Sequence, residues 1–165
     1  MARKIVMFLT LFLLALTSGA AFVIWLDFNP SGLSPTFYAE KWQHAIRVFM
    51  IPLNTVAILS VLFTIAATFL FRRDRSRPYL LLGASVCVIA ATLITFFGSV
   101  PIINQITTWS VNSPPSNWME VAEKWQRFQT LRTILQTGAL AFVILSTLVH
   151  RGVSRQKESG KTAEA

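Results

Sequence analysis

The sequence predicts an all-α membrane protein in which four transmembrane helices form two similar helix pairs. Of the 165 residues, 53% are hydrophobic and only 13% are charged, whereas soluble domains carry about 25% charge. Four long stretches contain no charged residue. The pentapeptide Ala-Glu-Lys-Trp-Gln occurs at residues 39–43 and again at 122–126, each time just before an apolar stretch. A fixed internal period of this kind indicates a repeated structural unit.

The four spans are placed by the length of their apolar stretches. A membrane-crossing helix needs about 20 apolar residues, because lipid offers no hydrogen bonds to the backbone. The predicted spans are residues 5–26, 48–71, 79–100 and 133–150. The first is predicted to be a retained helix rather than a cleaved signal peptide, since its apolar character continues past Gly19 to Leu26. The third stretch is too long for one helix and is expected to leave the membrane near Pro101.

Two outer amphipathic helices are expected at about residues 35–47 and 117–132, each continuing directly into the next span. Ser34 followed by Pro35 is typical of an N-cap and first helical position. Asn117 and Glu120 have the spacing of a capping box. The four-helix domain then covers residues 1–153, and the polar residues 154–165 are predicted to form a disordered cytoplasmic tail.

The distribution of Lys and Arg predicts the orientation. Ten of these residues lie in the N-terminus, the 72–77 loop and the tail, against five in the two longer loops and their helices. The positive-inside rule therefore predicts that both termini are cytoplasmic, and we expect the protein in a bacterial inner membrane. The net charge of +8 is explained by this topology and by anionic lipid, so no nucleic-acid partner is expected.

Cysteine and histidine usage excludes several classes of membrane bundle. The single cysteine, Cys87, excludes an internal disulfide and a dithiol redox pair. His44 and His150 lie near opposite ends of the predicted bundle, about one bilayer thickness apart, and cannot bracket one haem. No zinc spacing or phosphate-binding loop is present, so we expect no metal and no cofactor. The bilayer itself is the expected partner.

Aromatic and polar residues gather near the outer boundary. The five tryptophans fall there, which is typical of an interfacial belt but also of an aromatic mouth for a flat lipophilic molecule. Polar side chains in or near spans usually face the bundle interior. The predicted site places Arg132 and Asn104 at its centre, within hydrogen-bond range. The candidate ligand-binding residues are Trp42, Asn54, Asn104, Trp109, Trp118, Trp125, Gln129 and Arg132.

The second half carries a familiar pattern: Pro101-Ile102-Ile103-Asn104, then Trp109 and Trp118, then the stretch from Trp125 to Arg132-Thr133. This pattern resembles the anthrone oxygenase-like family of small four-helix membrane proteins, many of which have no assigned function. The chain has Pro-x-x-Asn where that family tends to have Pro-x-Asn. It also has Phe128-Gln129 where the family often has Trp followed by Asn or His, and glutamine cannot act as a base.

The resemblance implies a cofactor-free oxygenase that acts on an electron-rich aromatic substrate. Such a reaction needs a base to form a carbanion. The candidate catalytic residues are Glu40, His44 and Glu123. Arg132, Asn104 and Gln129 are candidates for stabilising the anion.

Two other classes of function stay open from the sequence. The first is an accessory membrane protein that holds a lipid, a quinone or a partner helix between the two halves, with close helix contact at small residues such as Gly83 and Gly138. The second is a transporter, for which four spans without an acidic residue require assembly into a homo-oligomer.

Overall fold

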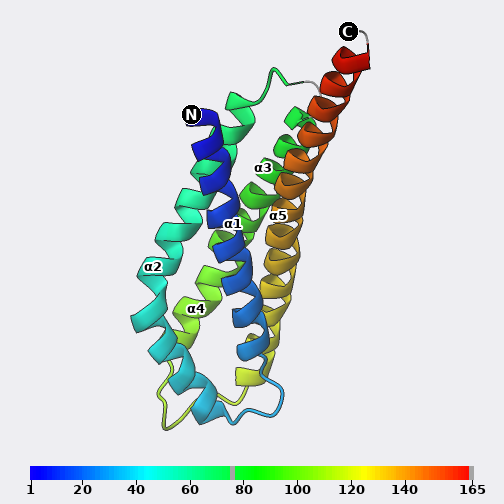
Figure 1. Cartoon of the computed structure of the whole chain (residues 1–165). Helices are drawn as coiled ribbons and strands as arrows, with labels where there is room; N and C mark the ends of the chain where they lie inside the picture. The colour runs from blue at the N-terminus through cyan, green and yellow to red at the C-terminus, as the bar shows by residue number, and fades with distance from the viewer. Residues whose placement is uncertain (75–76, 164–165) are drawn as a thin grey trace.

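The protein is all-helical in a computed structural model that describes residues 1–74 and 77–163; the side chains of residues 50, 51, 77 and 150–163 are outside this description (Figure 1). The helices are α1 (Ala2–Asp27), α2 (Pro35–Leu70), α3 (Arg77–Ile94), α4 (Val100–Thr107) and α5 (Trp118–Ala163). The π-helical turn η1 (Thr95–Ser99) joins α3 to α4.

Four helical segments are long and apolar enough to cross a membrane, as the sequence predicts. They are Ala2–Asp27, Pro52–Leu70, Pro78–Thr107 and Trp118–Val149. The third is longer than expected, because the helical path continues through Pro101 instead of ending before it. Proline lacks an N–H group, and its position at the start of α4, directly after a π-helical turn, leaves no helical hydrogen bond to be lost there.

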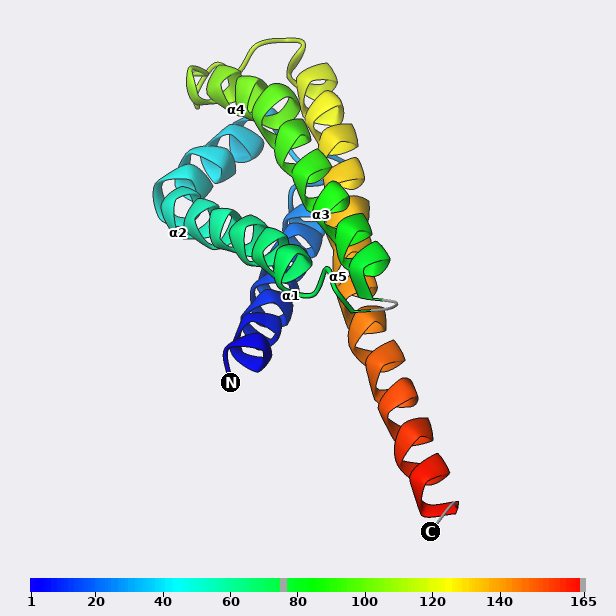
Figure 2. The same ribbon diagram turned by 90° about the horizontal axis from the view of Figure 1, so that it is seen from above.

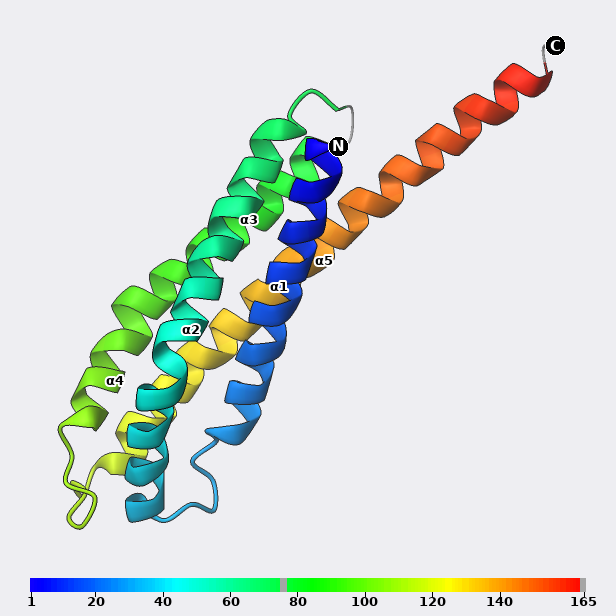
Figure 3. The same ribbon diagram turned by 60° about the vertical axis from the view of Figure 1, so that its left-hand side comes forward.

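The two long helices α2 and α5 each combine an outer segment with a span. In α2 the predicted cap is confirmed: the Ser34 hydroxyl accepts a hydrogen bond of 3.3 Å from the Phe37 N–H, and Pro35 begins the helix. In α5 the helix begins at Trp118, one residue after Asn117, and continues to Ala163. Figure 3 shows α5 extending past the other helices. Disorder of residues 154–165 stays a prediction, and residues 164–165 are outside the description.

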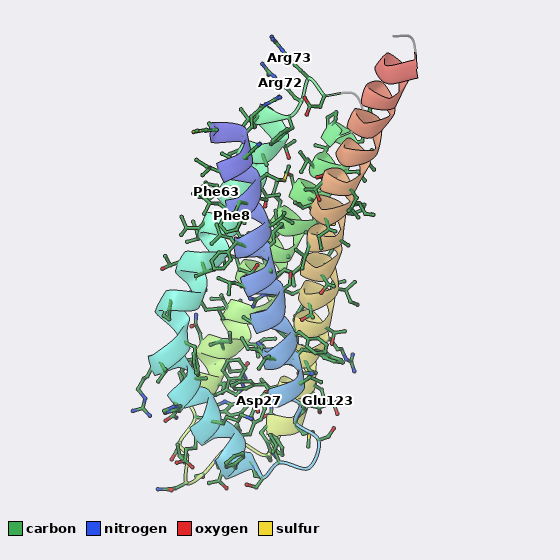
Figure 4. All side chains as sticks on the ribbon, viewed as in Figure 1. Phe8, Asp27, Phe63, Arg72, Arg73 and Glu123 are labelled. Carbon is green, nitrogen blue, oxygen red and sulfur yellow. The ribbon has the colours of Figure 1, made fainter. Side chains whose placement is uncertain are left out.

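The four long helical segments are α1, α2, the continuous α3–η1–α4 and α5. They form a ring in which α1 and α3 each pack against both α2 and α5. Figure 1 places both termini at one end of the bundle, with the end of α2 and the start of α3. Figure 4 shows Arg72 and Arg73 at this end, and Asp27 and Glu123 at the opposite end. The connections α1–α2 and α4–α5 therefore lie together at the end that the sequence predicts to be outer.

Two buried clusters hold the ring together. One cluster, here called the inner cluster, lies toward the end that holds the termini. It contains the small side chains of Ala67, Ala84 and Ala139, which are fully buried and let the helices approach closely. The outer cluster is built around Trp42, Trp125 and Ile106. Large apolar side chains such as Phe8 face outward along the rods, which is the arrangement expected of a surface that lipid covers.

Candidate functional site

One face of α5 carries a row of polar or partly polar side chains into the bundle. Trp125, Gln129, Arg132 and Gln136 are spaced by four, three and four residues and so share a face. Gln129 is fully buried and Gln136 is 7% exposed. Because polar groups within a membrane are costly and usually functional or paired, this row defines the region in which to look for a site.

Hydrogen bonds from α1 fix the orientation of this row. The Gln129 side-chain amide donates to the Ala21 carbonyl at 3.0 Å, and the Thr133 hydroxyl donates to the same carbonyl at 3.3 Å. One turn deeper, the Ser18 hydroxyl donates to the Gln136 carbonyl at 3.1 Å. These bonds hold α5 against α1, so the remaining polar groups of the row point away from α1.

Those groups border a cavity of about 260 Å³ between α2, α3 with η1, and α5. Its wall is mostly apolar, and Asn54, Arg132 and Gln136 contribute polar groups to it. Two residues before Asn54, Pro52 interrupts the hydrogen bonds inside α2, and Figure 2 shows α2 changing direction along its length. A mainly apolar cavity with a few convergent polar groups is typical of a small-molecule site, although this one is slightly smaller than usual.

Arg132 is the most informative residue of this cavity. It lies inside the candidate span Trp118–Val149 and is half-buried. Among residues 1–74 and 77–163 it has no hydrogen-bond or ion-pair partner. The buried Oε1 atoms of Gln129 and Gln136 also lack a partner within the described chain. A cation within a membrane-spanning segment is normally paired, so Arg132, half-buried and without a partner in the described chain, makes this cavity the candidate binding site.

The structure separates Arg132 from Asn104, and the expected hydrogen bond between them is not formed in the described part of the chain. Asn104 is exposed on α4. The register follows from Gly98, which lies against the ring of Phe128. Asn104 is six residues outward of Gly98 and Arg132 is four residues inward of Phe128, so the two differ by about 15 Å in depth at 1.5 Å per residue.

Three of the five tryptophans are buried at the end of the bundle that the sequence predicts to be outer. Trp42, Trp109 and Trp125 are 5%, 8% and 2% exposed. The rings of Trp42 and Trp125 meet edge to face with centroids 4.7 Å apart, and Trp118 packs on Tyr38 at 5.7 Å. Rings on helices that converge at the end of a bundle bury most area against each other, so they form a plug rather than a lipid-facing belt.

Tyr38 is a buried polar residue that our sequence reasoning missed. Its side chain is fully buried in the outer cluster, outside the spanning part of α2, and burial raises the pKa of its hydroxyl to about 12. Neither this hydroxyl nor the indole N–H groups of Trp42 and Trp125 have a hydrogen-bond partner among the described residues. The signal available in the sequence was the spacing of four residues between Tyr38 and Trp42, which places both on one helix face.

The three candidate bases lie elsewhere. Glu40, His44 and Glu123 are all exposed at the outer end, and none of them lines the Arg132 cavity. Glu123 borders a separate, shallow hollow of about 440 Å³ with Met119 and Arg127. The cavity can therefore bind and polarise a molecule through Arg132, while its described lining provides no carboxylate or imidazole to remove a proton.

Comparison with known proteins adds an independent result. The family model described as anthrone oxygenase matches residues 40–142, which include the cavity lining and most of the outer cluster. No curated protein and no solved structure matches the chain.

Proposed function

This chain belongs to the anthrone oxygenase family, and from that premise we propose that it binds a flat, lipophilic aromatic compound in the cavity beside Arg132. The observation that carries the proposal is a half-buried arginine without a partner in the described chain, in an apolar cavity within the candidate spans. The sequence led us to expect the ligand at the outer mouth; the cavity favours a site deeper in the bundle.

The cavity suits an aromatic compound that carries a phenol or an enolisable carbonyl. Loss of a proton from such a compound leaves an oxyanion conjugated to the ring. The guanidinium of Arg132 would stabilise that charge, and the amides of Asn54 and Gln136 are placed around the same cavity to donate hydrogen bonds. In a site with little water these interactions are stronger than in solution.

Oxygenation of the ligand is the catalytic form of this proposal. The substrate CH₂ group gives a proton to hydroxide from the solvent, and the carbanion gives an electron to O₂. The two radicals combine as a peroxide anion, which takes a proton back from water. Loss of water then leaves a carbonyl, so the substrate plus O₂ gives the ketone plus water. Arg132 would favour the first step by lowering the pKa of the substrate, which reduces the strength of base required.

Paired arginine variants test both forms. The purified protein in nanodiscs would be titrated with anthrone under nitrogen, and oxygen uptake would then be followed in air. Arg132→Gln should lose most of the anthrone binding, whereas Arg127→Gln, which changes an exposed arginine on the same helix, should retain it. Equal binding by the two variants would remove the proposal. Binding without oxygen uptake would favour an accessory protein that holds a lipophilic ligand.

We also infer that the two halves of the chain are parallel repeats related by a two-fold axis along the membrane normal. The crossed bonds of the two pentapeptide glutamines support this. The Gln43 amide donates to the Trp109 carbonyl at 3.0 Å, and the Gln126 amide donates to the Trp25 carbonyl at 2.8 Å. The glutamine of each half thus binds a carbonyl at the end of the first span of the other half, which is the pattern that a two-fold axis produces.

The same inference includes cytoplasmic termini in a bacterial inner membrane. The shared position of both termini and of Arg72 and Arg73 at one end supports it (Figure 4). The other basic groups predicted at that end, at positions 75, 77, 151, 155, 157 and 161, lie outside the described side chains. Binding of a partner helix, or assembly of several copies, stays an alternative for the outward apolar faces.

A further inference from the structure

We infer that the Arg132 cavity is entered sideways from the lipid bilayer, through an opening between α2 and α3, and not from water at either end of the bundle. The ligand is then a planar compound dissolved in the membrane. This inference rests on the proposed function for the identity of the ligand, but the route follows from how the cavity is closed and where its rim is exposed.

The outer end of the cavity is closed by the aromatic cluster. Trp42 and Trp125 are 5% and 2% exposed, and Ile106 beside them is fully buried. The Gln43 hydrogen bond to the Trp109 carbonyl ties α2 to the α4–α5 connection at this end. A molecule arriving from the outer aqueous phase would have to separate these packed rings.

The inner end is closed as well. Val88, one turn inward of the cavity residue Ala91, is 2% exposed, and Leu81 and Ala84 are fully buried. The Thr68 hydroxyl on α2 contacts the Leu81 carbonyl at 3.0 Å and the Ser85 hydroxyl at 2.8 Å, which joins α2 to α3. On the third side, α1 is held against α5 by the hydrogen bonds of Ser18 and Ala21 described above.

The remaining side faces lipid and is open. Ile58 and Leu62 on α2 and Phe96 on η1 all line the cavity, yet they are 57%, 57% and 59% exposed. Residues that border a cavity and also face outward form its rim. Figure 2 shows α2 bent away from the α3–α4 rod on this side. Because the rim lies within candidate spans, the medium in front of it is the bilayer.

This route selects the chemical class of the ligand. A compound crossing an apolar rim must be uncharged, because moving an ion through the hydrocarbon region is costly. Once beside Arg132, the same compound gains from becoming an anion. The site therefore selects molecules that are neutral in the membrane and weakly acidic in the cavity, such as phenols and enolisable ketones on fused rings.

Two carbene-generating reagents test the route without any natural ligand. One is a diazirine on a phospholipid acyl chain and the other is a water-soluble diazirine, each applied to the full chain in nanodiscs and mapped by mass spectrometry. We expect the lipid reagent to label Thr92 and Gln136, which line the cavity, and the water-soluble reagent to leave them unlabelled. Labelling from water alone, or from neither reagent, would overturn the inference.

Tryptophan substitutions at the rim provide the matched control. Ile58→Trp and Leu62→Trp should lower the lipid-phase labelling of Thr92 several-fold. Leu59→Trp, at an exposed position on the same helix that does not line the cavity, should not. The labelling requires no ligand. A protein that is labelled at Thr92 from the lipid phase but does not bind anthrone would therefore reject the proposed function and leave the bilayer route standing.

Discussion

The backbone of Gly98 lies directly against the ring of Phe128: a Cβ atom at position 98 would stand 2.7 Å from Phe128 Cδ1. This contact between η1 and α5 sets the register that places Arg132 beside Thr95 in one cavity. It also means that any other residue at this position requires movement of the Phe128 ring or of one of the two helical segments.

Substitution of Gly98 should therefore destabilise the bundle. Gly98→Ala is expected to cost about 1–3 kcal/mol, because the added methyl overlaps a ring that is close to its own backbone. Gly138→Ala is the control, since a Cβ there meets nothing within 4 Å and alanine favours the helix by up to about 1 kcal/mol. Thermal unfolding in detergent would measure both; a Gly98→Ala protein as stable as wild type would contradict the register.

The buried hydroxyl of Tyr38 predicts loss of stability at high pH. Its pKa is about 12 in the folded protein, against an ordinary tyrosine pKa of 10.0. The unfolded chain thus loses this proton first, so the contribution of Tyr38 is complete below pH 10 and is lost as pH rises toward 12. Between pH 10 and pH 12 the unfolding temperature of wild type should fall more steeply with pH than that of Tyr38→Phe. Parallel slopes would show that the hydroxyl ionises freely.

Replacing Arg132 should separate stability from binding. Because Arg132 has no partner in the described chain, Arg132→Leu removes an uncompensated cation and should leave the ligand-free protein as stable as wild type or up to ~2 kcal/mol more stable. Binding of anthrone should be lost in the same variant. Lys124→Leu, at an exposed position of α5, controls for the general effect of removing a charge. A strongly destabilised Arg132→Leu protein would indicate a structural role instead.

Reporter fusions test the orientation. Fusions after residue 75 and after residue 161 should both report a cytoplasmic location, because the basic residues are concentrated at that end. A fusion within the α4–α5 connection, after residue 112, should report the opposite side. A periplasmic signal from either of the first two fusions would reverse the proposed topology.

Local patterns in the sequence were sufficient for the four spans, except for the end of the third, and insufficient for the site. The apolar stretches predicted four spans, and Ser34-Pro35 predicted where α2 begins, because these signals act within a few residues. The predicted pairing of Asn104 with Arg132 failed because it assumed a tight turn between adjacent ends. The actual register depends on the packing of Gly98 on Phe128, a contact across thirty positions that no local pattern encodes.

The aromatic residues illustrate the same limit. Their position near the outer boundary was predictable, but whether a ring faces lipid, a ligand or another ring depends on how helices converge. Trp42 and Trp125 lie on different helices and bury each other. From the sequence, Asn54 was recognised as an unusual polar group in a span, and Arg132 was placed at the end of the second outer helix. Both line the cavity, but the cavity itself depends on the bend of α2.

The meeting of Trp42 with Trp125 has a consequence for the history of the chain. Ala39 and Ala122 begin the two pentapeptides 83 positions apart, so in the proposed repeat Trp42 and Trp125 are equivalent residues that touch across its axis. If the proposed repeat arose by duplication, its precursor was a helix pair that assembled as a homodimer of identical chains. In the present chain the equivalent of Arg132 is Phe49, which faces outward. The arginine therefore belongs to one half alone, an asymmetry that two identical subunits cannot have.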